Sequence, residues 1–505
     1  MGTKSKHLHL SIGSDMLWSL VILAGFAFFT SLVPLPPNDY WWHLRIGEVI
    51  FTEHAIPNTN LYSWSVPAEQ PYFYAAWLGE LLLYLIHRIG GVELTTFTRT
   101  LLAVITFWLV GVEARRSSGS WRIAAPVLAF ACLMSINNLI VRPQMWAWLP
   151  FMIMYRCLSR YAAGERHKKF LIICPVLLLF WVNLHGSFIL GLGMMGIFLL
   201  GEVIRYWLRL SGALTKNQLG WLAGTTGVSL VGTLINPRFT GIITYIRELL
   251  TSQPVQQLIE EWQSPTPEGW ANVAFFISIL IFITALTASR SHLTPSEVML
   301  SLAFLWMAWQ GQRSVIWYGM VTMPLLAKLL KDIPLRALTI PVQRNAINFL
   351  IAISLFIPAV LVQPWFIDQF PLPETYRAQV LHDPEIGPLL SPHTPTGAAR
   401  YLVEHPTSKL FNELGFGSYL IWATPELKVF IDPRIELYPQ EIWEDYVNIS
   451  NGVRTPLLLQ KYAIEGVVLD KEIQPELSLA LMSHSGWQRV YDDSSTEIWV
   501  LTNKP

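Results

Sequence analysis

The sequence has few charged residues and no net charge. Charged side chains make up 14% of its 505 residues, and 35 Lys and Arg balance 35 Asp and Glu. A soluble domain of this size would carry about 25% charged residues. The low charge therefore argues against a soluble protein. The zero net charge provides no global field that would favour a polyanion, so we expect no nucleic-acid partner.

Cysteine is scarce as well. The chain contains three, Cys132, Cys157 and Cys174, and all lie within apolar runs. Cysteines in such runs usually pack as small hydrophobic residues, so the pattern predicts neither a disulfide framework nor a zinc or iron site. No internal repeat or low-complexity tract is apparent, which argues against solenoids and against transporters built from inverted repeats.

Apolar residues are abundant instead, at 52% of the chain, with a mean hydropathy of +0.39. A hydrocarbon core of about 30 Å needs about 20 mainly apolar residues in a helix. The pattern predicts an α-helical polytopic membrane protein with about 11 transmembrane helices. The predicted spans are 16–34, 93–113, 122–141, 143–160, 170–184, 187–208, 218–236, 271–289, 296–311, 314–331 and 346–366.

A shorter apolar run at 74–90 decides the topology, because it contains Glu80, His87 and Arg88. If this run lies along the membrane surface, most Lys and Arg before residue 367 fall on the side of the N-terminus, as the positive-inside rule expects. We therefore predict an interfacial helix at 74–90 and a cytoplasmic N-terminus. The first span lacks a small-residue cleavage site and is expected to be retained.

The composition changes near residue 367. The later part is more charged, is rich in proline at 371–395, and contains short β-like runs at Leu427–Ile431 and Gly466–Leu469. We predict a transmembrane domain at 1–366, with its first external loop at 35–92, and an external α/β domain at 367–505. A bacterial inner (cytoplasmic) membrane, with this domain in the periplasm, is the expected location.

One segment directly after the first span combines many polar and aromatic side chains. It reads Asn38-Asp39-Tyr40-Trp41-Trp42-His43-Leu44-Arg45-Ile46-Gly47-Glu48. Asp39 could act as a general base or a metal ligand, or it could cap the following helix, and the residue type alone gives capping even odds with catalysis. A cap does not need Trp41, Trp42, His43 and Glu48 nearby. These neighbours favour a sugar-binding site.

Three arginines, Arg142, Arg238 and Arg313, fall at the external ends of predicted spans. An arginine near hydrocarbon is costly unless it snorkels or pairs with an anion such as a lipid phosphate. Snorkelling suffices for any one of them. Three on the face that otherwise has few basic residues suggest a shared anion, and Arg99 could belong with them.

Other polar positions have simpler interpretations. Asn183 and His185 lie in a break between two apolar runs, which favours a polar turn over a catalytic role. Glu261 could end a surface helix or contact an acceptor. Asp432 and Arg434 follow a β-like run, where a turn or an ion pair is the more typical use.

Taken in order, these motifs resemble those of bacterial membrane proteins with a GT-C glycosyltransferase-like fold. The resemblance covers most of the chain. It is carried by Asp39 to Gly47, Ile56-Pro57-Asn58-Thr59-Asn60-x-Tyr62-Ser63, Trp77-Leu78-Gly79-Glu80, Arg142-Pro143-Gln144, Trp181-Val182-Asn183-Leu184-His185-Gly186, Asn236-Pro237, Glu261-Trp262, Phe411-Asn412, Gly415 to Leu420 and Ile431-Asp432-x-Arg434.

The resemblance implies an acidic residue in the first external loop that acts as base or metal ligand, and Asp39 occupies that position. It also implies surface helices in that loop and a sugar donor on a polyprenyl phosphate or pyrophosphate. Several such enzymes carry a second acidic motif in the next external loop, where this chain has Asn137-Asn138-Leu139-Ile140-Val141-Arg142. A bound divalent cation, Mg²⁺ or Mn²⁺, therefore stays open.

The leading hypothesis is an inverting glycosyltransferase with Asp39 as catalytic base, a polyprenyl-phosphate-linked sugar donor, and a glycan, lipid or protein acceptor. The alternatives are a non-catalytic binding or transport protein for lipid-linked glycans and, less favoured, an assembly subunit. The expected substrate-binding residues are Trp41, Trp42, His43, Arg45, Glu48, Glu80, Arg142, Gln144, Asn183, His185, Arg238, Glu261 and Arg313.

Overall fold

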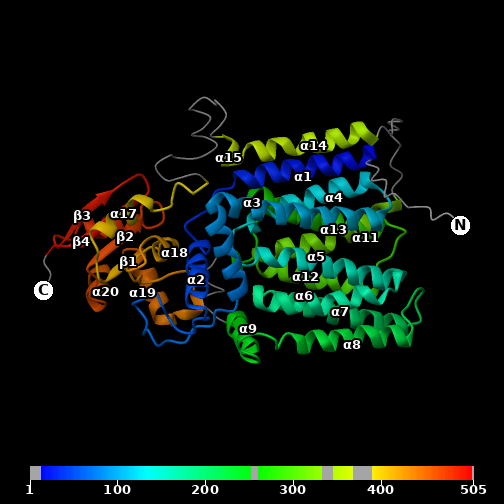
Figure 1. The fold of residues 1–505 in the computed structure, drawn as a ribbon, viewed down its shortest axis with the longest axis horizontal. Coiled ribbons are helices and arrows are strands. Elements are labelled where there is room, and N and C mark those ends of the chain that lie inside the picture. The colour runs from blue at the N-terminus through cyan, green and yellow to red at the C-terminus, as the bar shows by residue number, and fades with distance from the viewer. Residues whose placement is uncertain (1–12, 252–259, 333–344, 368–388, 503–505) are drawn as a thin grey trace.

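The computed structural model describes residues 13–251, 260–332, 345–367 and 389–502. A bundle of long, roughly parallel helices forms one part and a smaller α/β unit the other, with helix α2 (Tyr40–Glu53) between them (Figure 1). The long helices are α1 (Ser14–Leu32), α3 (Trp77–Ser118), α4 (Trp121–Met134), α5 (Met145–Arg160), α6 (Lys168–Leu184), α7 (Phe188–Trp207), α8 (Lys216–Gly232), α11 (Gly269–Ala288), α12 (Pro295–Gln310), α13 (Val315–Leu329) and α14 (Asn345–Leu361).

Each apolar run predicted to span the membrane contains one of these helices within the described residues. Four of the helices, α1, α3, α7 and α11, are long and apolar enough by themselves to cross a membrane. The chain is thus an integral membrane protein with a mainly helical fold, as predicted. That all the runs cross the membrane stays a prediction. The cysteines are buried and unpaired, consistent with a packing role.

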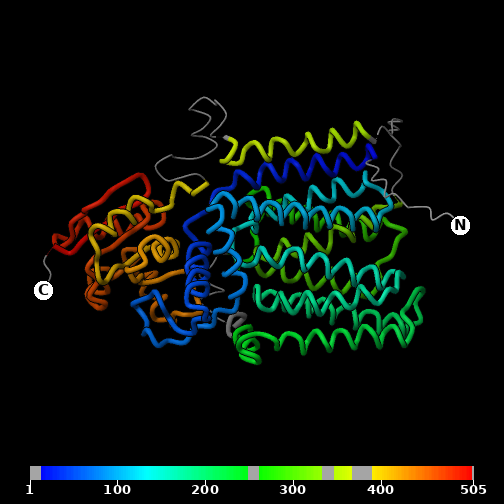
Figure 2. Tube along the Cα trace, in the orientation of Figure 1, coloured from blue at the N-terminus to red at the C-terminus, as the bar shows by residue number. Residues whose placement is uncertain are grey.

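Helix α3 is bent at Gly90 and Gly91, where the backbone leaves the helical region. Gly91 has φ of +63°, which a residue without Cβ adopts most easily. The part of α3 before this bend runs beside α2 and across the ends of the bundle helices (Figure 2). This orientation agrees with the predicted interfacial helix at 74–90, which begins here at Trp77 and continues directly into the next helix.

Short elements connect the bundle. They are the single turns η1 (Ile136–Asn138), η3 (Glu260–Trp262), η4 (Gln312–Ser314) and η5 (Leu330–Asp332), the π-helical turn η2 (Tyr161–Glu165), and the helices α9 (Gly241–Thr251) and α15 (Pro364–Ile367). Those nearest the α/β unit, η1, η3, η4 and α9, lie at the same end of the bundle as α2.

The C-terminal unit contains a four-stranded sheet with strand order β1-β2-β4-β3. β1 (Leu410–Asn412) is parallel to β2 (Gly466–Asp470), and β4 (Thr496–Leu501) is antiparallel to both β2 and β3 (Trp487–Asp492). Its helices are α17 (Thr396–Glu404), α18 (Leu414–Ala423), η6 (Ile435–Leu437), α19 (Gln440–Ser450), α20 (Thr455–Lys461) and α21 (Pro475–Met482). The predicted α/β class is correct.

The β-like run at Leu427–Ile431 is not a strand, which corrects the prediction. Val429 instead pairs with the first external loop, through its N–H to the Tyr62 carbonyl and its carbonyl to the Trp64 N–H. The amide oxygen of Asn412 accepts the N–H of Phe430. The extended segment therefore joins the C-terminal unit to the loop at 35–92.

A buried ion pair reinforces this joint. Arg434 donates to both carboxylate oxygens of Asp432, at 2.8 and 2.7 Å, and to the Tyr74 hydroxyl of the first loop at 3.2 Å. The Tyr438 hydroxyl donates to the same carboxylate. The ion-pair interpretation of this motif is confirmed. Removing one partner of such a pair leaves an uncompensated buried charge, so the loop and the C-terminal unit depend on each other.

We predict that Gly47→Ala lowers stability. A Cβ at Gly47 would lie 2.2 Å from the carbonyl oxygen of Glu80 and 2.7 Å from Cβ of Tyr84, so α2 and α3 would have to separate. Overpacking of this kind costs about 1–3 kcal/mol, measurable by thermal unfolding in detergent. Gly224→Ala on α8 is the matched control, because its Cβ would meet open space. Equal unfolding temperatures for the two variants would contradict the close contact.

Candidate functional site

A cavity of about 810 Å³ lies where the bundle, the first external loop and the C-terminal unit meet. Its walls come from segments that are far apart in the sequence, including α2, α3, α9, η3, η4 and η6. The predicted site residues that line it are Asp39, Trp42, His43, Glu80, Arg142, Gln144, His185, Glu261 and Arg313. The cavity thus collects most of the residues singled out from the sequence.

The Asp39 side chain is not used as a helix cap. Asp39 precedes α2 with helical backbone angles, and its carboxylate makes no capping hydrogen bond. Its backbone N–H is bound by the Asn38 side chain. The carboxylate, 21% exposed, instead lies 3.2 Å from Nη1 of Arg142. Of the two interpretations of Asp39, the structure therefore disfavours capping.

Arg142 connects two carboxylates. Besides Asp39 it contacts Glu261, with 2.8 Å between Nη2 and Oε2, and its own side chain is 8% exposed. Arg313 lies 3.2 Å from the same Glu261, and its guanidinium stacks over Trp262 at 4.2 Å. The anion that these two arginines share in the structure is thus the Glu261 carboxylate.

The two carboxylates beside Arg142 differ in basicity. Burial raises the pKa of Asp39 above its usual range, although Arg142 opposes the rise, and Glu261 adds to it. Burial also raises the pKa of Glu261, but Arg142 and Arg313 together outweigh it and lower the pKa to about 2. Two acids whose environments separate their pKa values have distinct roles. Asp39 is the better proton acceptor, and Glu261 is the permanent counter-charge.

His43 and Glu80 form a hydrogen-bonded pair, with 2.8 Å between Nδ1 and Oε1. Burial lowers the pKa of His43, with further lowering by His185 and Arg142. In the part of α3 before the bend, burial raises the pKa of Glu80 to about 8. Burial thus disfavours the charged form of both partners. Trp42 lies against the imidazole with ring centres 3.6 Å apart.

His185 follows α6, and its Nδ1 accepts hydrogen bonds from the Ser187 N–H and hydroxyl. It is a satisfied turn histidine, as predicted, and it also lines the cavity. Burial, Arg313 and Arg142 lower its pKa to about 3, so it is neutral. Asn183 lies outside this cavity: its oxygen accepts from Trp77, and its amide nitrogen donates to two backbone carbonyls.

Other predicted residues also lie outside the cavity lining. Trp41 packs edge-on against Tyr419. Arg45 and Glu48 form an ion pair with each other one turn apart on α2, and each is about a quarter exposed. Arg99 is buried and donates to the carbonyl of Thr30, in the last turn of α1, and to that of Val33, directly after α1. Arg99 therefore stabilises a helix end and does not join the other arginines.

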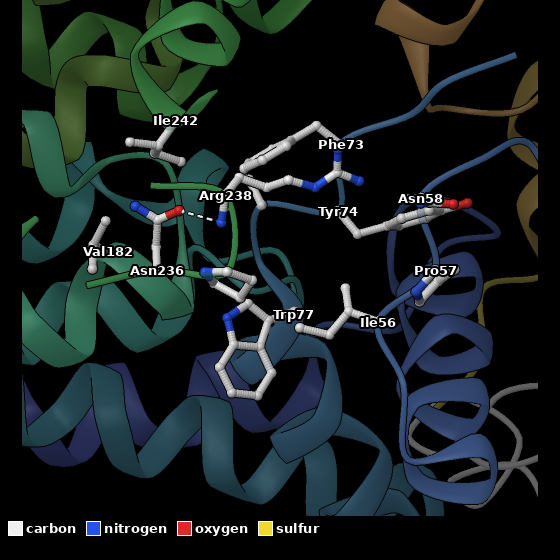
Figure 3. Close-up of a pocket in the computed structure, with 12 residues that line it drawn as sticks. Ile56, Pro57, Asn58, Phe73, Tyr74, Trp77, Val182, Asn236, Arg238 and Ile242 are labelled. Atoms are coloured by element: carbon white, nitrogen blue, oxygen red, sulfur yellow. Dashed lines mark hydrogen bonds between the residues drawn. The ribbon is translucent and has the colours of Figure 1, made fainter. Parts of the chain in front are cut away.

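Arg238 lies in a separate, smaller pocket of about 160 Å³ (Figure 3). Its guanidinium stacks over Phe73 at 5.3 Å, and its backbone N–H is held by the Asn236 side chain. Phe73, Tyr74 and Ala75 line both pockets and form the wall between them. Arg238 thus does not share an anion with Arg142 and Arg313, contrary to the expectation.

Among the cavity residues that were not predicted from the sequence are Glu436, on η6 of the C-terminal unit, and Tyr245, on α9. Both line the cavity and are hydrogen-bonded to each other. Glu436 lies nearly 400 positions after Asp39, so no local pattern links them. The sequence feature closest to Glu436 was the motif Ile431-Asp432-x-Arg434, which directly precedes η6.

The cavity does not offer an obvious divalent-cation site. Within the described ranges, no group of three or more His, Cys, Asp and Glu side chains is arranged to hold a metal ion. Asp39 and Glu261 are both bound by arginine side chains. The acidic residues of the cavity therefore do not fit Mg²⁺ or Mn²⁺.

No protein-family model matches the chain, and no curated protein matches it significantly by sequence. Solved structures do match. The apo oligosaccharyltransferase from Archaeoglobus fulgidus aligns with a TM-score of 0.50 at 12% identity, over 94% of this chain and 73% of that one. ArnT from Cupriavidus metallidurans bound to undecaprenyl phosphate aligns with a TM-score of 0.49 at 14% identity, over 95% and 97%. The chain therefore shares the fold of the oligosaccharyltransferase, which agrees with the GT-C-like fold that the sequence motifs predicted.

We predict that Arg142→Met strongly destabilises the protein, because Asp39 loses its partner and Glu261 keeps only Arg313. Removal of one partner of a buried pair costs about 3–5 kcal/mol, and we expect the lower end because both carboxylates are partly exposed. Thermal unfolding in detergent measures the loss. The matched control is Arg290→Met, an exposed arginine after α11. A loss no larger than that of the control would show that Arg142 does not compensate the carboxylates.

Proposed function

We propose that the chain is a membrane glycosyltransferase that transfers a sugar from a polyprenyl-phosphate-linked donor to a glycan, lipid or protein acceptor at the outer face of the membrane. The observation that carries the proposal is the Asp39 carboxylate. It faces a large cavity between bundle and C-terminal unit, is held by one arginine, and has a raised pKa. The GT-C fold supports the same class of reaction.

In the proposed reaction the acceptor hydroxyl loses its proton to Asp39 while its oxygen attacks the anomeric carbon. The bond from that carbon to the phosphate oxygen breaks, and the electron pair leaves with the phosphate. Asp39 then releases the proton to water. A single displacement of this kind inverts the anomeric configuration. General-base assistance contributes about 10²–10⁴ in rate.

The arginines on the bundle side of the cavity would receive the phosphate. Each guanidinium carries five N–H donors, more than the carboxylate contacts use. Arg313 is 20% exposed and has Glu261 as its ion-pair partner. Because Glu261 stays ionised, it orients both guanidiniums before the donor arrives. Charge-assisted hydrogen bonds from such fixed donors stabilise the negative charge that develops on a leaving phosphate.

The proposed orientation follows from the distribution of basic residues. The N-terminus and most Lys and Arg of the bundle loops would face the cytoplasm. The cavity, the first external loop and the C-terminal unit would face the periplasm, and the bundle would cross the inner membrane. The donor lipid could then reach the cavity from the bilayer while the acceptor enters from water.

We predict that Asp39→Asn lowers kcat at least about 100-fold while the unfolding temperature and polyprenyl-phosphate binding stay close to wild type. The assay is sugar transfer by the purified protein across a panel of polyprenyl-phosphate-linked sugars. Asp15→Asn, at the start of α1, is the matched acid-to-amide control. Full transfer by the Asp39 variant would exclude this residue as the base. Donor binding without transfer by the wild type would favour the alternative of a non-catalytic glycan-binding protein.

The pH dependence should identify the base. Asp39 acts only when ionised, so kcat/KM should fall as the pH drops through its pKa, which burial raises above the ordinary 3.8. Glu261 raises this pKa and Arg142 lowers it. Glu261→Gln should therefore move the acidic limb to lower pH, and Arg142→Met should move it to higher pH. If both variants moved the acidic limb of the kcat/KM profile in the same direction, that limb would reflect the titration of a group other than Asp39.

A further inference from the structure

The C-terminal unit contributes part of the cavity lining. Leu414, Pro433, Ile435, Glu436 and Ile473 all line it, and all belong to this unit. The guanidiniums of Arg142 and Arg313 come from the bundle loops. The C-terminal unit therefore adds an acidic group and apolar groups to the lining.

Glu436 is held in place from both sides along the chain. Two residues before it, Arg434 is fully buried in its ion pair with Asp432, and two residues after it, Tyr438 donates to the same carboxylate. Arg434 also donates to Tyr74 of the first loop. Buried hydrogen bonds thus fix the one-turn helix η6 on both sides, and Glu436 has a defined position before any ligand binds.

Glu436 has a neutral partner within the described residues. The Tyr245 hydroxyl shares a hydrogen bond with its carboxylate, and the Tyr245 ring lies against Phe73 with centres 5.1 Å apart. Asp39 and Arg313 are close enough to influence Glu436 electrostatically. The carboxylate also accepts a backbone N–H of its own residue, and burial raises the pKa of Glu436. A carboxylate has about four lone-pair sites, so these two hydrogen bonds leave others that can accept donors from a ligand.

Glu436 adds an acidic group to those already paired around the cavity. Arg142 and Arg313 are paired with Asp39 and Glu261, and His43 is hydrogen-bonded to Glu80. Glu436 belongs to none of these pairs, so in its ionised form it carries a negative charge that they do not balance. Apolar side chains line the same cavity, since Ile435 directly precedes Glu436, and Leu414 and Ile473 come from the same C-terminal unit.

We propose that Glu436, with the apolar residues of the C-terminal unit that line the same cavity, forms an acceptor subsite that takes a positively charged, hydrogen-bond-donating group attached to an apolar face. That the bound group belongs to an acceptor substrate rests on the proposed function, whereas the preference of the subsite for a positively charged group does not. The arginines would hold the anionic donor on one side of Asp39, and Glu436 would hold the acceptor on the other. Asp39 then lies between the two substrates.

The test uses the full chain in nanodiscs and three sugars that differ in the charge of one substituent, namely glucosamine, glucose and glucuronate. Their dissociation constants are measured by isothermal titration calorimetry at neutral pH. A hydrogen bond to a charged group is worth about 1.5–3 kcal/mol, so glucosamine should bind about tenfold or more tightly than glucose, and glucuronate more weakly than both. Equal or tighter binding of glucuronate would overturn the proposal.

Variants assign the preference to a residue. Glu436→Gln keeps the hydrogen bond from Tyr245 but should lose the advantage of glucosamine over glucose, and Glu436→Asp should restore part of it. Glu444→Gln, on the exposed side of α19, is the matched control and should keep the advantage. If Asp39→Asn abolishes the preference and Glu436→Gln does not, the cation binds at Asp39 and the subsite is wrong.

These measurements distinguish failure of the proposed subsite from failure of the proposed function. A glucosamine preference that depends on Glu436, in a protein that transfers no sugar, would retain the subsite and reject the glycosyltransferase. Sugar transfer that depends on Asp39, without any preference for glucosamine, would retain the enzyme and reject the subsite.

Discussion

The architecture of the cavity depends on the burial of one charge, that of Arg142. A guanidinium that is 8% exposed at the end of a membrane bundle needs anionic partners, because removing such a charge from water is costly. The chain supplies two, Asp39 from the first external loop and Glu261 from the long loop before α11. Arg313 then completes the pairing of Glu261. Four segments of the chain thereby converge on one site, and their side chains are oriented without a ligand.

A second buried pair places the other half of the site. Asp432 and Arg434 join the C-terminal unit to Tyr74, and the extended segment around Val429 pairs with residues near Tyr62. Apolar side chains from α2 and from the sheet share one core across this joint. The C-terminal unit is thus integral to the cavity, because it contributes both a wall and the carboxylate of Glu436.

Local sequence patterns predicted the helices well, because apolar run length is a property of neighbouring residues. They also singled out Asp39, which lines the cavity, while its catalytic role stays a prediction. They were less able to separate cavity residues from others on the same segment. Arg45 and Glu48 lie one turn apart on α2, and their opposite charges satisfy each other. Arg99 looked like a fourth arginine of the set, but the free carbonyls at the end of α1 provide its partners. Leu427–Ile431 has strand-like composition, yet a side chain and a loop occupy its hydrogen bonds.

The sequence by itself determined that this is a membrane protein with a helical bundle, a helix near 74–90 and a C-terminal α/β unit. These features follow from hydropathy, charge distribution and composition, which act over short distances along the chain. Only the tertiary structure decided which charges meet. Asp39, Arg142, Glu261 and Glu436 are separated by more than a hundred residues at each step, and their pairing depends on the three-dimensional packing that brings distant loops to one end of the bundle.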